Sequence, residues 1–160
     1  MIYVIRCFYE ERQSKFSWSE AELRCQASGS HLVTINSEEQ LQEVKDALGG
    51  VIAESYWIGL NDQDTEGTYV WSDGTQLGDW SNWEAEEPDA GIEKNCVAMF
   101  TSGYAWKTSN CTKERYHICS KPKGSSQLNR WIGKLKGHIY ARLQSILLSL
   151  GSCCYLFSNS

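Results

Sequence analysis

The seven cysteines of this chain are the feature that most restricts how it can fold. They are Cys7, Cys25, Cys96, Cys111, Cys119, Cys153 and Cys154. None of them forms a Cys-x-x-Cys pair, which disfavours a zinc knuckle or a thioredoxin-like redox site. Widely separated cysteines in an acidic, Trp-rich chain are more typical of structural disulfides, which form in oxidising compartments. We therefore expect a disulfide-stabilised domain that is extracellular or secreted.

The distribution of charge divides the chain into two parts. Residues 1–120 hold all twenty acidic residues and nine Lys and Arg residues, a net charge of −11. The last forty residues hold six basic residues and no acidic one, a net charge of +6. We therefore predict one domain over residues 1–121 and a basic tail over residues 122–160 that is disordered or weakly helical. No nucleic-acid partner is expected, because the pattern of alternating basic and aromatic residues is missing.

The tail is open to three interpretations. Residues 139–157 are fairly apolar, but Arg142, Gln144 and Gly151 weaken this segment as a membrane span. A floppy tail is the first interpretation, a basic helix at a membrane interface the second and a membrane anchor the third. A membrane partner is expected only if the tail is an anchor.

A first helix is predicted from its capping residues. Ser17 and Glu20 have the capping-box spacing, so a helix should begin there and continue to about Ser28. Gly29 would end it. The side chains expected near the core are Ala21, Leu23 and Cys25.

A second helix is predicted in the same way. Ser37 and Gln40 again have the capping-box spacing, and Gly49 follows a helical pattern that ends at about Leu48. The apolar residues of this helix recur at helical spacing. Its buried stripe should comprise Leu41, Val44 and Leu48.

The rest of the chain up to residue 121 favours short strands and one long irregular segment. The predicted strands cover residues 2–9, 31–35, 56–60, 68–71, 96–100, 104–107 and 116–119. Residues 61–95 are mostly irregular, and a segment of this length in a compact domain is usually either functional or disordered. Trp71, Trp80 and Trp83 argue against disorder. We therefore expect the functional site in this segment.

Three features occur in a characteristic order along the chain. They are Trp57-Ile58-Gly59-Leu60, Glu87-Pro88-Asp89 and the four cysteines Cys25, Cys96, Cys111 and Cys119. Together they resemble the C-type lectin-like domain over about residues 7–121. The resemblance implies an α+β fold in which two helices pack on short antiparallel sheets with a long irregular loop region. It also implies the disulfides Cys25–Cys119 and Cys96–Cys111.

The resemblance bears on the N-terminus as well. Cys7 would be half of an additional disulfide whose partner precedes Met1. The first residues are too few and too soon followed by Arg6 to form a secretory signal. We therefore expect a truncated N-terminus.

In the family, the loop that corresponds to Glu87-Pro88-Asp89 contains a cis proline and binds both calcium and sugar. One carboxylate and one amide normally contact adjacent sugar hydroxyls, but this chain has two carboxylates and so lacks the amide donor. Lys107 and Thr108 stand where the family has Asn and Asp. Lysine has no acceptor, so we expect Lys107 to project toward the two carboxylates in place of the ion. The alternative is that its side chain points into water. Trp80 is a further candidate ligand contact, through its ring face.

The resemblance implies two calcium sites, and both lack ligands in this chain. At the first site Lys94 replaces an acid, and Glu93 would have to substitute for it. At the second site, the two remaining ligand positions are Ala90, whose side chain cannot bind calcium, and Asn95, which could bind it only weakly. The candidate metal ligands are Glu87, Asp89, Glu93, Asp62 and Glu66. We expect calcium to bind weakly or not at all, and for Asp62 and Glu66 a role as solvated loop acids is an equal alternative.

The predicted function is a carbohydrate-binding recognition module with eroded calcium sites, whose partner is a carbohydrate or glycoprotein. The alternative is a calcium-independent, protein-binding C-type lectin-like domain. A glycosidase would use two carboxylates, and Glu86, Glu87, Asp89 and Glu93 form an acidic cluster. Acid-rich loops are more often cation sites or solvated surface, and the three histidines show no metal or triad spacing. We therefore predict that the chain is not an enzyme.

Overall fold

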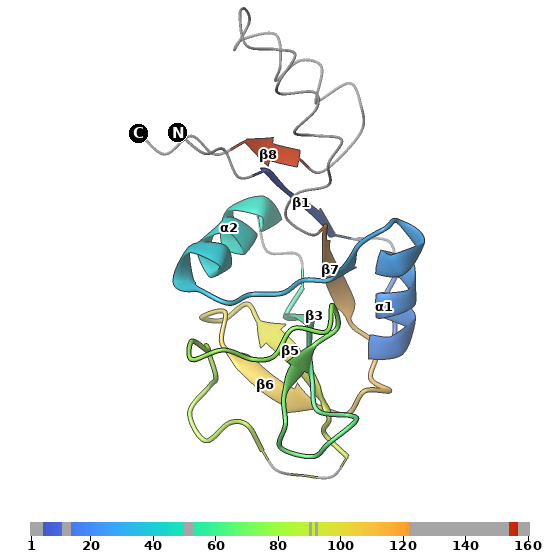
Figure 1. Ribbon diagram of the computed structural model, residues 1–160, viewed down its shortest axis with the longest axis vertical. Coiled ribbons are helices and arrows are strands. Elements are labelled where there is room, and N and C mark those ends of the chain that lie inside the picture. The colour runs from blue at the N-terminus through green and yellow to red at the C-terminus, as the bar shows by residue number, and fades with distance from the viewer. Residues whose placement is uncertain are drawn as a thin grey trace, which may run out of the picture.

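The structure of the protein, a computed structural model, describes residues 5–10, 14–49, 53–89, 91, 93–121 and 154–156 (Figure 1). Its elements are β1 Ile5–Glu10, α1 Trp18–Ala27, β2 His31–Leu32, α2 Glu38–Leu48, β3 Ser55–Asn61, β4 Val70–Trp71, β5 Cys96–Phe100, β6 Trp106–Ser109, β7 Tyr116–Ser120 and β8 Cys154–Leu156. The predicted α+β class and both helices are confirmed. Within the described ranges, no helix is long and apolar enough to cross a membrane.

The strands pair in the order β6-β5-β3-β7-β1-β8, with β2 on β7 and β4 on β3. The β3–β7 pair is parallel, and the other pairs are antiparallel. Figure 1 shows the two helices near the β7–β1 end of the sheet and the long segment between β4 and β5 at the opposite end. The later part of the segment that we expect to be functional therefore lies away from the helices, whereas Leu77 and Trp80 pack against the core cluster that includes the buried face of α2.

Helix α1 begins as predicted and buries a different set of side chains. Ser17 and Glu20 form the reciprocal capping box, in which the Ser17 N–H donates to Glu20 Oε2 at 3.1 Å. The prediction that Leu23 packs near the core is wrong, because its side chain is 64% exposed. The helical period places position 22 inside instead. The buried residues of α1 are Trp18, Ala21, Glu22 and Cys25.

The buried Glu22 is stabilised by hydrogen bonds to the segment after the helix. Its Oε2 accepts from the Leu32 N–H at 2.8 Å, and its Oε1 lies 2.6 Å from His31 Nδ1. A carboxylate is tolerated on the inner face of a helix when it has such partners. These contacts fix β2 against α1.

Helix α2 confirms its predicted buried stripe of Leu41, Val44 and Leu48. Ser37 Oγ accepts from the Gln40 N–H at 3.3 Å, and Gly49 ends the helix with φ of 55°. The reciprocal half of the expected capping box differs. Gln40 Oε1 accepts from the N–H of Asn36 at 2.7 Å, one residue before the cap.

Strand β3 crosses the centre of the core, and all of its residues are buried. A Cβ on Gly59 would lie 2.7 Å from Ser72 Oγ and 2.9 Å from the Leu32 carbonyl oxygen, so only glycine fits there. The indole N–H of Trp18 donates to the Ile58 carbonyl at 2.9 Å. The Trp-Ile-Gly-Leu sequence therefore joins α1, β2 and the loop region in one core.

Both predicted disulfides are present. Cys25–Cys119 joins α1 to β7, and Cys96–Cys111 joins β5 to the turn after β6. The first closes a sequence separation of 94 residues, which the chain-entropy model values at roughly 4–5 kcal/mol. The disulfides stabilise the scaffold that carries the loop.

The strands differ from the prediction in three main ways: β2 and β4 are shorter than predicted, β6 is displaced, and β8 lies in the segment predicted as tail. The strand predicted at residues 104–107 is β6, Trp106–Ser109, because Gly103 and Tyr104 have positive φ and extend the preceding turn. In the segment predicted as tail, β8 pairs with β1 and places Cys154 opposite Cys7. The predictions for the rest of residues 122–160 and for the N-terminus concern residues outside those described.

Candidate functional site

A cluster of tryptophan rings orders the irregular segment. Trp106 of β6 is fully buried and contacts Trp71, Trp80 and Trp83 edge to face, at centroid distances of 5.6, 5.5 and 5.8 Å. The Trp106 backbone also bonds to the segment, since its N–H donates to the Asn82 carbonyl at 2.8 Å. Trp83 and Trp80 both pack in this cluster, and Trp80 remains half-buried. This packing agrees with the expectation that the described part of the segment is ordered, and ligand contact by Trp80 stays a prediction.

Glu87 lies after this cluster, and protein donors hold its carboxylate. The Glu87–Pro88 peptide bond is cis, as the resemblance implied. Glu87 Oε2 accepts three hydrogen bonds: from the Thr108 hydroxyl at 2.6 Å, from the Thr108 N–H at 3.0 Å and from the Asp89 N–H at 3.0 Å. Thr108 is only 8% exposed. It therefore positions Glu87 from behind the loop surface.

Asp89 pairs with Lys94, a partner that the sequence did not predict. In the sequence, Lys94 stands where the family has an acidic calcium ligand. Lys94 Nζ donates to Asp89 Oδ2, and both side chains are 47% exposed. The hydrogen bond and the charge of Lys94 hold the pKa of Asp89 below its ordinary value. The same contact with Asp89 raises the pKa of Lys94. The second carboxylate of the loop is thus neutralised within the protein.

The expectation that Lys107 projects toward Glu87 and Asp89 is corrected. Lys107 Nζ lies 3.8 Å from Glu84 Oε2 and 5.1 Å from the centroid of the Phe100 ring. Successive side chains of a strand point to opposite faces. Because Thr108 faces Glu87, its neighbour on β6 faces away. Strand alternation was the signal that could have identified this.

Protein donors already contact one oxygen of each carboxylate in the Glu87–Asp89 pair, which leaves fewer ligands there for a calcium ion. Calcium takes six to eight oxygen ligands, whereas here Oε2 of Glu87 is occupied by three donors and Oδ2 of Asp89 by an ammonium. Glu93, the expected substitute, is exposed, and no contact joins it to Glu87 or Asp89 in the described part of the chain. At Asp89 the positive charge is supplied by Lys94.

A second set of oxygens in the same segment is differently arranged. Asp62 is 1% exposed, its Oδ2 accepts from the Gly67 N–H at 2.8 Å, and its own N–H donates to the Asn95 carbonyl at 3.1 Å. Oδ1 of Asp62 and Oδ1 of Asn95 are buried without a hydrogen-bond partner among the described residues. Such groups usually have a partner, and an unsatisfied one costs about 1–3 kcal/mol. Carboxylate and amide oxygens are of the type that hard cations prefer.

Tyr69 reports the negative potential around this second set. Burial is the first cause that raises its pKa. The charge of Asp62, a hydrogen bond to the Asp62 carboxylate and the charges of Glu66 and Glu87 raise it further. Glu66 itself is exposed. Ala90, at the other position of the implied second calcium site, lies outside the described residues.

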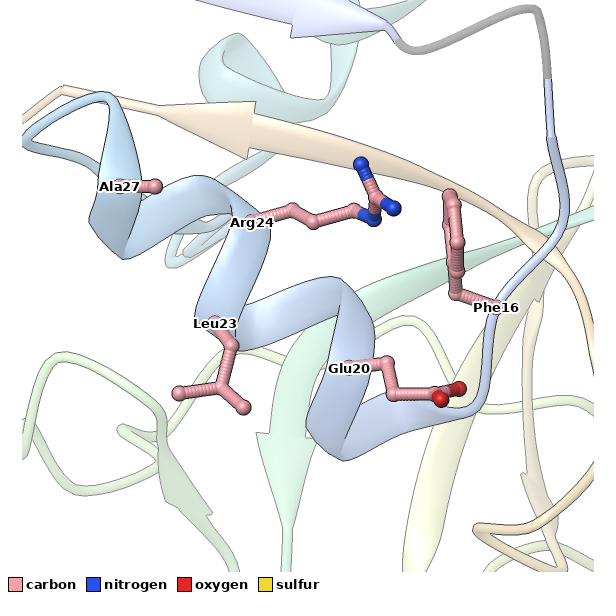
Figure 2. A pocket seen from close by; sticks show the side chains of 5 residues that line it. All are labelled: Phe16, Glu20, Leu23, Arg24 and Ala27. Atoms are coloured by element: carbon pink, nitrogen blue, oxygen red, sulfur yellow. The ribbon is translucent and has the colours of Figure 1, made fainter.

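A shallow hollow elsewhere, on the outer face of α1, contains none of the predicted site residues. It has a volume of about 280 Å³. Its lining residues are Phe16, Glu20, Leu23, Arg24 and Ala27. Figure 2 shows Arg24 reaching toward Phe16, and its guanidinium lies 3.8 Å from the centre of that ring. The exposed Leu23 belongs to this surface.

Residues 14–121 match the family model of the lectin C-type domain. The chain belongs to this family. Human C-type lectin domain family 17, member A is 39% identical over 116 residues, which cover 72% of this chain and 29% of that protein. The chain thus spans under a third of the length of this relative. Family members generally act as binding proteins and not as enzymes.

Two solved structures are similar to this C-type lectin domain in fold and sequence. The carbohydrate-recognition domain of the mouse scavenger receptor C-type lectin has a TM-score of 0.66 and 34% identity, over 75% of this chain and 91% of that one. A calcium-independent type II antifreeze protein has a TM-score of 0.66 and 30% identity, over 74% of this chain and 88% of that one. The same fold therefore also occurs in a protein that is calcium-independent.

Proposed function

We propose that this chain is a carbohydrate-recognition domain whose Glu87–Asp89 loop binds its ligand without a calcium ion. The observation that carries the proposal is the pairing of Glu87 with Thr108 and of Asp89 with Lys94. Similarity to a carbohydrate-recognition domain supports the ligand class, and similarity to a calcium-independent protein supports the absence of the ion.

The chemistry of the loop suits a polyhydroxylated ligand. A sugar hydroxyl both donates and accepts hydrogen bonds. The carboxylates of Glu87 and Asp89 supply acceptors, while Lys94 bears N–H groups beyond the one bonded to Asp89. Lys94 thereby provides the donor that the missing amide of the family motif would supply. In this proposal Trp80 adds an apolar ring face, Thr108 holds Glu87, and Lys107 contacts the ligand only at the margin, beside Glu84.

The proposal includes one cation, bound at a distance from these carboxylates. Asp62 and Asn95 would hold it through their unpartnered Oδ1 atoms, and Glu66 would add negative charge nearby. Calcium, a hard cation that prefers oxygen ligands, matches this donor set. When bound, it would fix the loop and take no part in contacting the sugar. Glu93 is assigned no role in this site.

The biological setting follows from the same proposal. Disulfides suggest an extracellular domain, where glycans and glycoproteins are available as partners. The chain would bind and not cleave them. Release of a chromogenic aglycone from a glycoside, lost in Glu87→Gln, would contradict this assignment.

Binding of the full chain to immobilised oligosaccharides tests the proposal. The probes are mannose-, galactose- and N-acetylglucosamine-terminated oligosaccharides, each presented in calcium and in EDTA. We expect binding that persists in EDTA, is lost in Asp89→Ala and is kept in Asp46→Ala, an exposed acid on α2. Binding that requires calcium would contradict the calcium-independent loop. Absence of binding to every probe would reject the carbohydrate assignment and favour a protein ligand.

A further inference from the structure

The turn after β6 contains a triplet that the ligand site does not use. The sequence has seven asparagines, and only Asn110 is followed two positions later by Ser or Thr, in Asn110-Cys111-Thr112. An Asn-x-Ser/Thr triplet is the acceptor of N-linked glycans when it lies at the surface of a secreted protein. Asn110 is partly exposed, and Thr112 and Lys113 are exposed.

The hydrogen bonds of this turn leave the reactive atom available. Asn110 Oδ1 accepts from the Thr112 N–H at 2.9 Å and from the Thr112 hydroxyl at 2.7 Å. The Asn110 carbonyl accepts from the Lys113 N–H at 3.1 Å. No described residue bonds to Asn110 Nδ2. The carboxamide is therefore held by its oxygen, and its nitrogen remains open.

A second turn in the chain shows that the structure alone does not require asparagine. Asp73 Oδ1 accepts from the Thr75 N–H at 3.0 Å and from the Thr75 hydroxyl at 2.7 Å. The two turns share these two hydrogen bonds from the threonine, and a carboxylate serves in one of them. Asp73 Oδ2 also accepts from the Thr34 hydroxyl at 2.8 Å. An amide nitrogen at position 110 adds nothing to the turn, whereas it is the group that a glycan acceptor must have.

We propose that Asn110 is a site of N-linked glycosylation. In this step Asn110 Nδ2 bonds to the anomeric carbon of a lipid-diphosphate-linked oligosaccharide. The bond from that carbon to the diphosphate breaks, the lipid diphosphate leaves, and a base of the cellular transferase takes the amide proton. The sugar then projects from the turn beside Cys111, whose disulfide to Cys96 anchors it to the sheet. The proposal rests on passage through the secretory compartment and is independent of what the loop binds.

Expression of the full chain behind an added leader peptide in mammalian cells tests this site. We expect the secreted wild type to lose mass on treatment with an amidase that removes N-glycans, with aspartate left at position 110 in the peptide mass spectrum. Asn110→Gln and Thr112→Val should lose the modification, while Thr112→Ser, which keeps the hydroxyl, should retain it.

The equivalent turn provides a matched control. Asp73→Asn in the Asn110→Gln background creates an Asn-Gly-Thr triplet in an exposed turn with the same two hydrogen bonds from the threonine. Thr34→Val is added to this variant, because the Thr34 hydroxyl otherwise bonds to the second oxygen of residue 73. Gain of a glycan there shows that the secreted chain meets the transferase. An unmodified Asn110 in the secreted, disulfide-bonded wild type would overturn the proposal. So would a glycan that persists in Asn110→Gln.

Discussion

The segment between β3 and β5 holds two sets of side-chain oxygens whose surroundings differ. At Glu87 and Asp89, Thr108 and Lys94 already donate to the carboxylates. At Asp62 and Asn95, one buried oxygen of each side chain has no partner in the described residues. The two sets lie in the same segment, and both consist of side-chain oxygens of the type that bind hard cations. The comparison teaches that a count of acids does not predict a metal site, because protein donors can already occupy their oxygens.

The largest effect on stability is expected from removing the Thr108 hydroxyl, which donates a hydrogen bond to Glu87. Thr108→Val keeps the shape of this buried side chain and removes the hydroxyl that donates to Glu87. Because hydrogen bonds to charged groups are stronger than neutral ones, the free energy of unfolding should fall by about 1.5–3 kcal/mol. Denaturant unfolding measures this. Thr108→Ser, which retains the hydroxyl, is the control, and equal loss in both variants would mean that packing and not the hydrogen bond is responsible.

The next effect concerns the unsatisfied set. Calcium should raise the thermal midpoint of the wild type and leave that of Asp62→Asn unchanged. Ligand at a hundredfold excess over its Kd stabilises a protein by about 2.7 kcal/mol, which sets the scale of the shift. In EDTA the variant should be at least as stable, because a neutral amide costs less to bury than a carboxylate.

Thermal melts in calcium and in EDTA decide this prediction. Asp64→Asn changes an exposed acid of the same segment and should behave as the wild type. A calcium response that survives in Asp62→Asn would place the cation elsewhere.

The smallest effect is expected at the exposed Asp89–Lys94 pair. The pKa of Asp89 is depressed in the folded protein, so its stabilisation is present above the pKa of the unfolded chain. It is lost as the pH falls through the folded pKa. Lys94→Gln should move the pKa of Asp89 upward, with little change in stability at neutral pH because exposed pairs contribute little.

Titration of the Asp89 carboxyl by NMR measures that shift. Lys113→Gln removes an exposed lysine from the turn after β6 and should leave the Asp89 pKa unchanged. An identical Asp89 pKa in the wild type and Lys94→Gln would show that the ion pair does not form in solution.

Local signals in the sequence predicted most of the scaffold. Ser17 and Ser37 identified the helix starts. The resemblance to the family, through the order of its four cysteines, identified both disulfides. The error at Leu23 came from applying alternate spacing to a helix, whose buried face instead includes Glu22. The helix starts depend on residues close in the chain, and the disulfides follow from a strong family motif, so both could be predicted from the sequence.

The candidate site was less predictable because its contacts depend on loop conformation. Lys94 reaches Asp89 across the turn that follows the cis Pro88, and nothing in its spacing indicates that pairing. Thr108 meets Glu87 across 21 residues of sequence. Lys107 was assigned the wrong partner because strand alternation was not applied to β6. Unpartnered oxygens such as Asp62 Oδ1 become visible only in three dimensions.

Calorimetric titration of calcium into the full chain tests the central claim most directly, since it counts the ions that the two sets hold. The account predicts a single binding event that is lost in Asp62→Asn and kept in Asp89→Asn. Two calcium ions per chain, or loss of binding in Asp89→Asn with the fold retained, would contradict it.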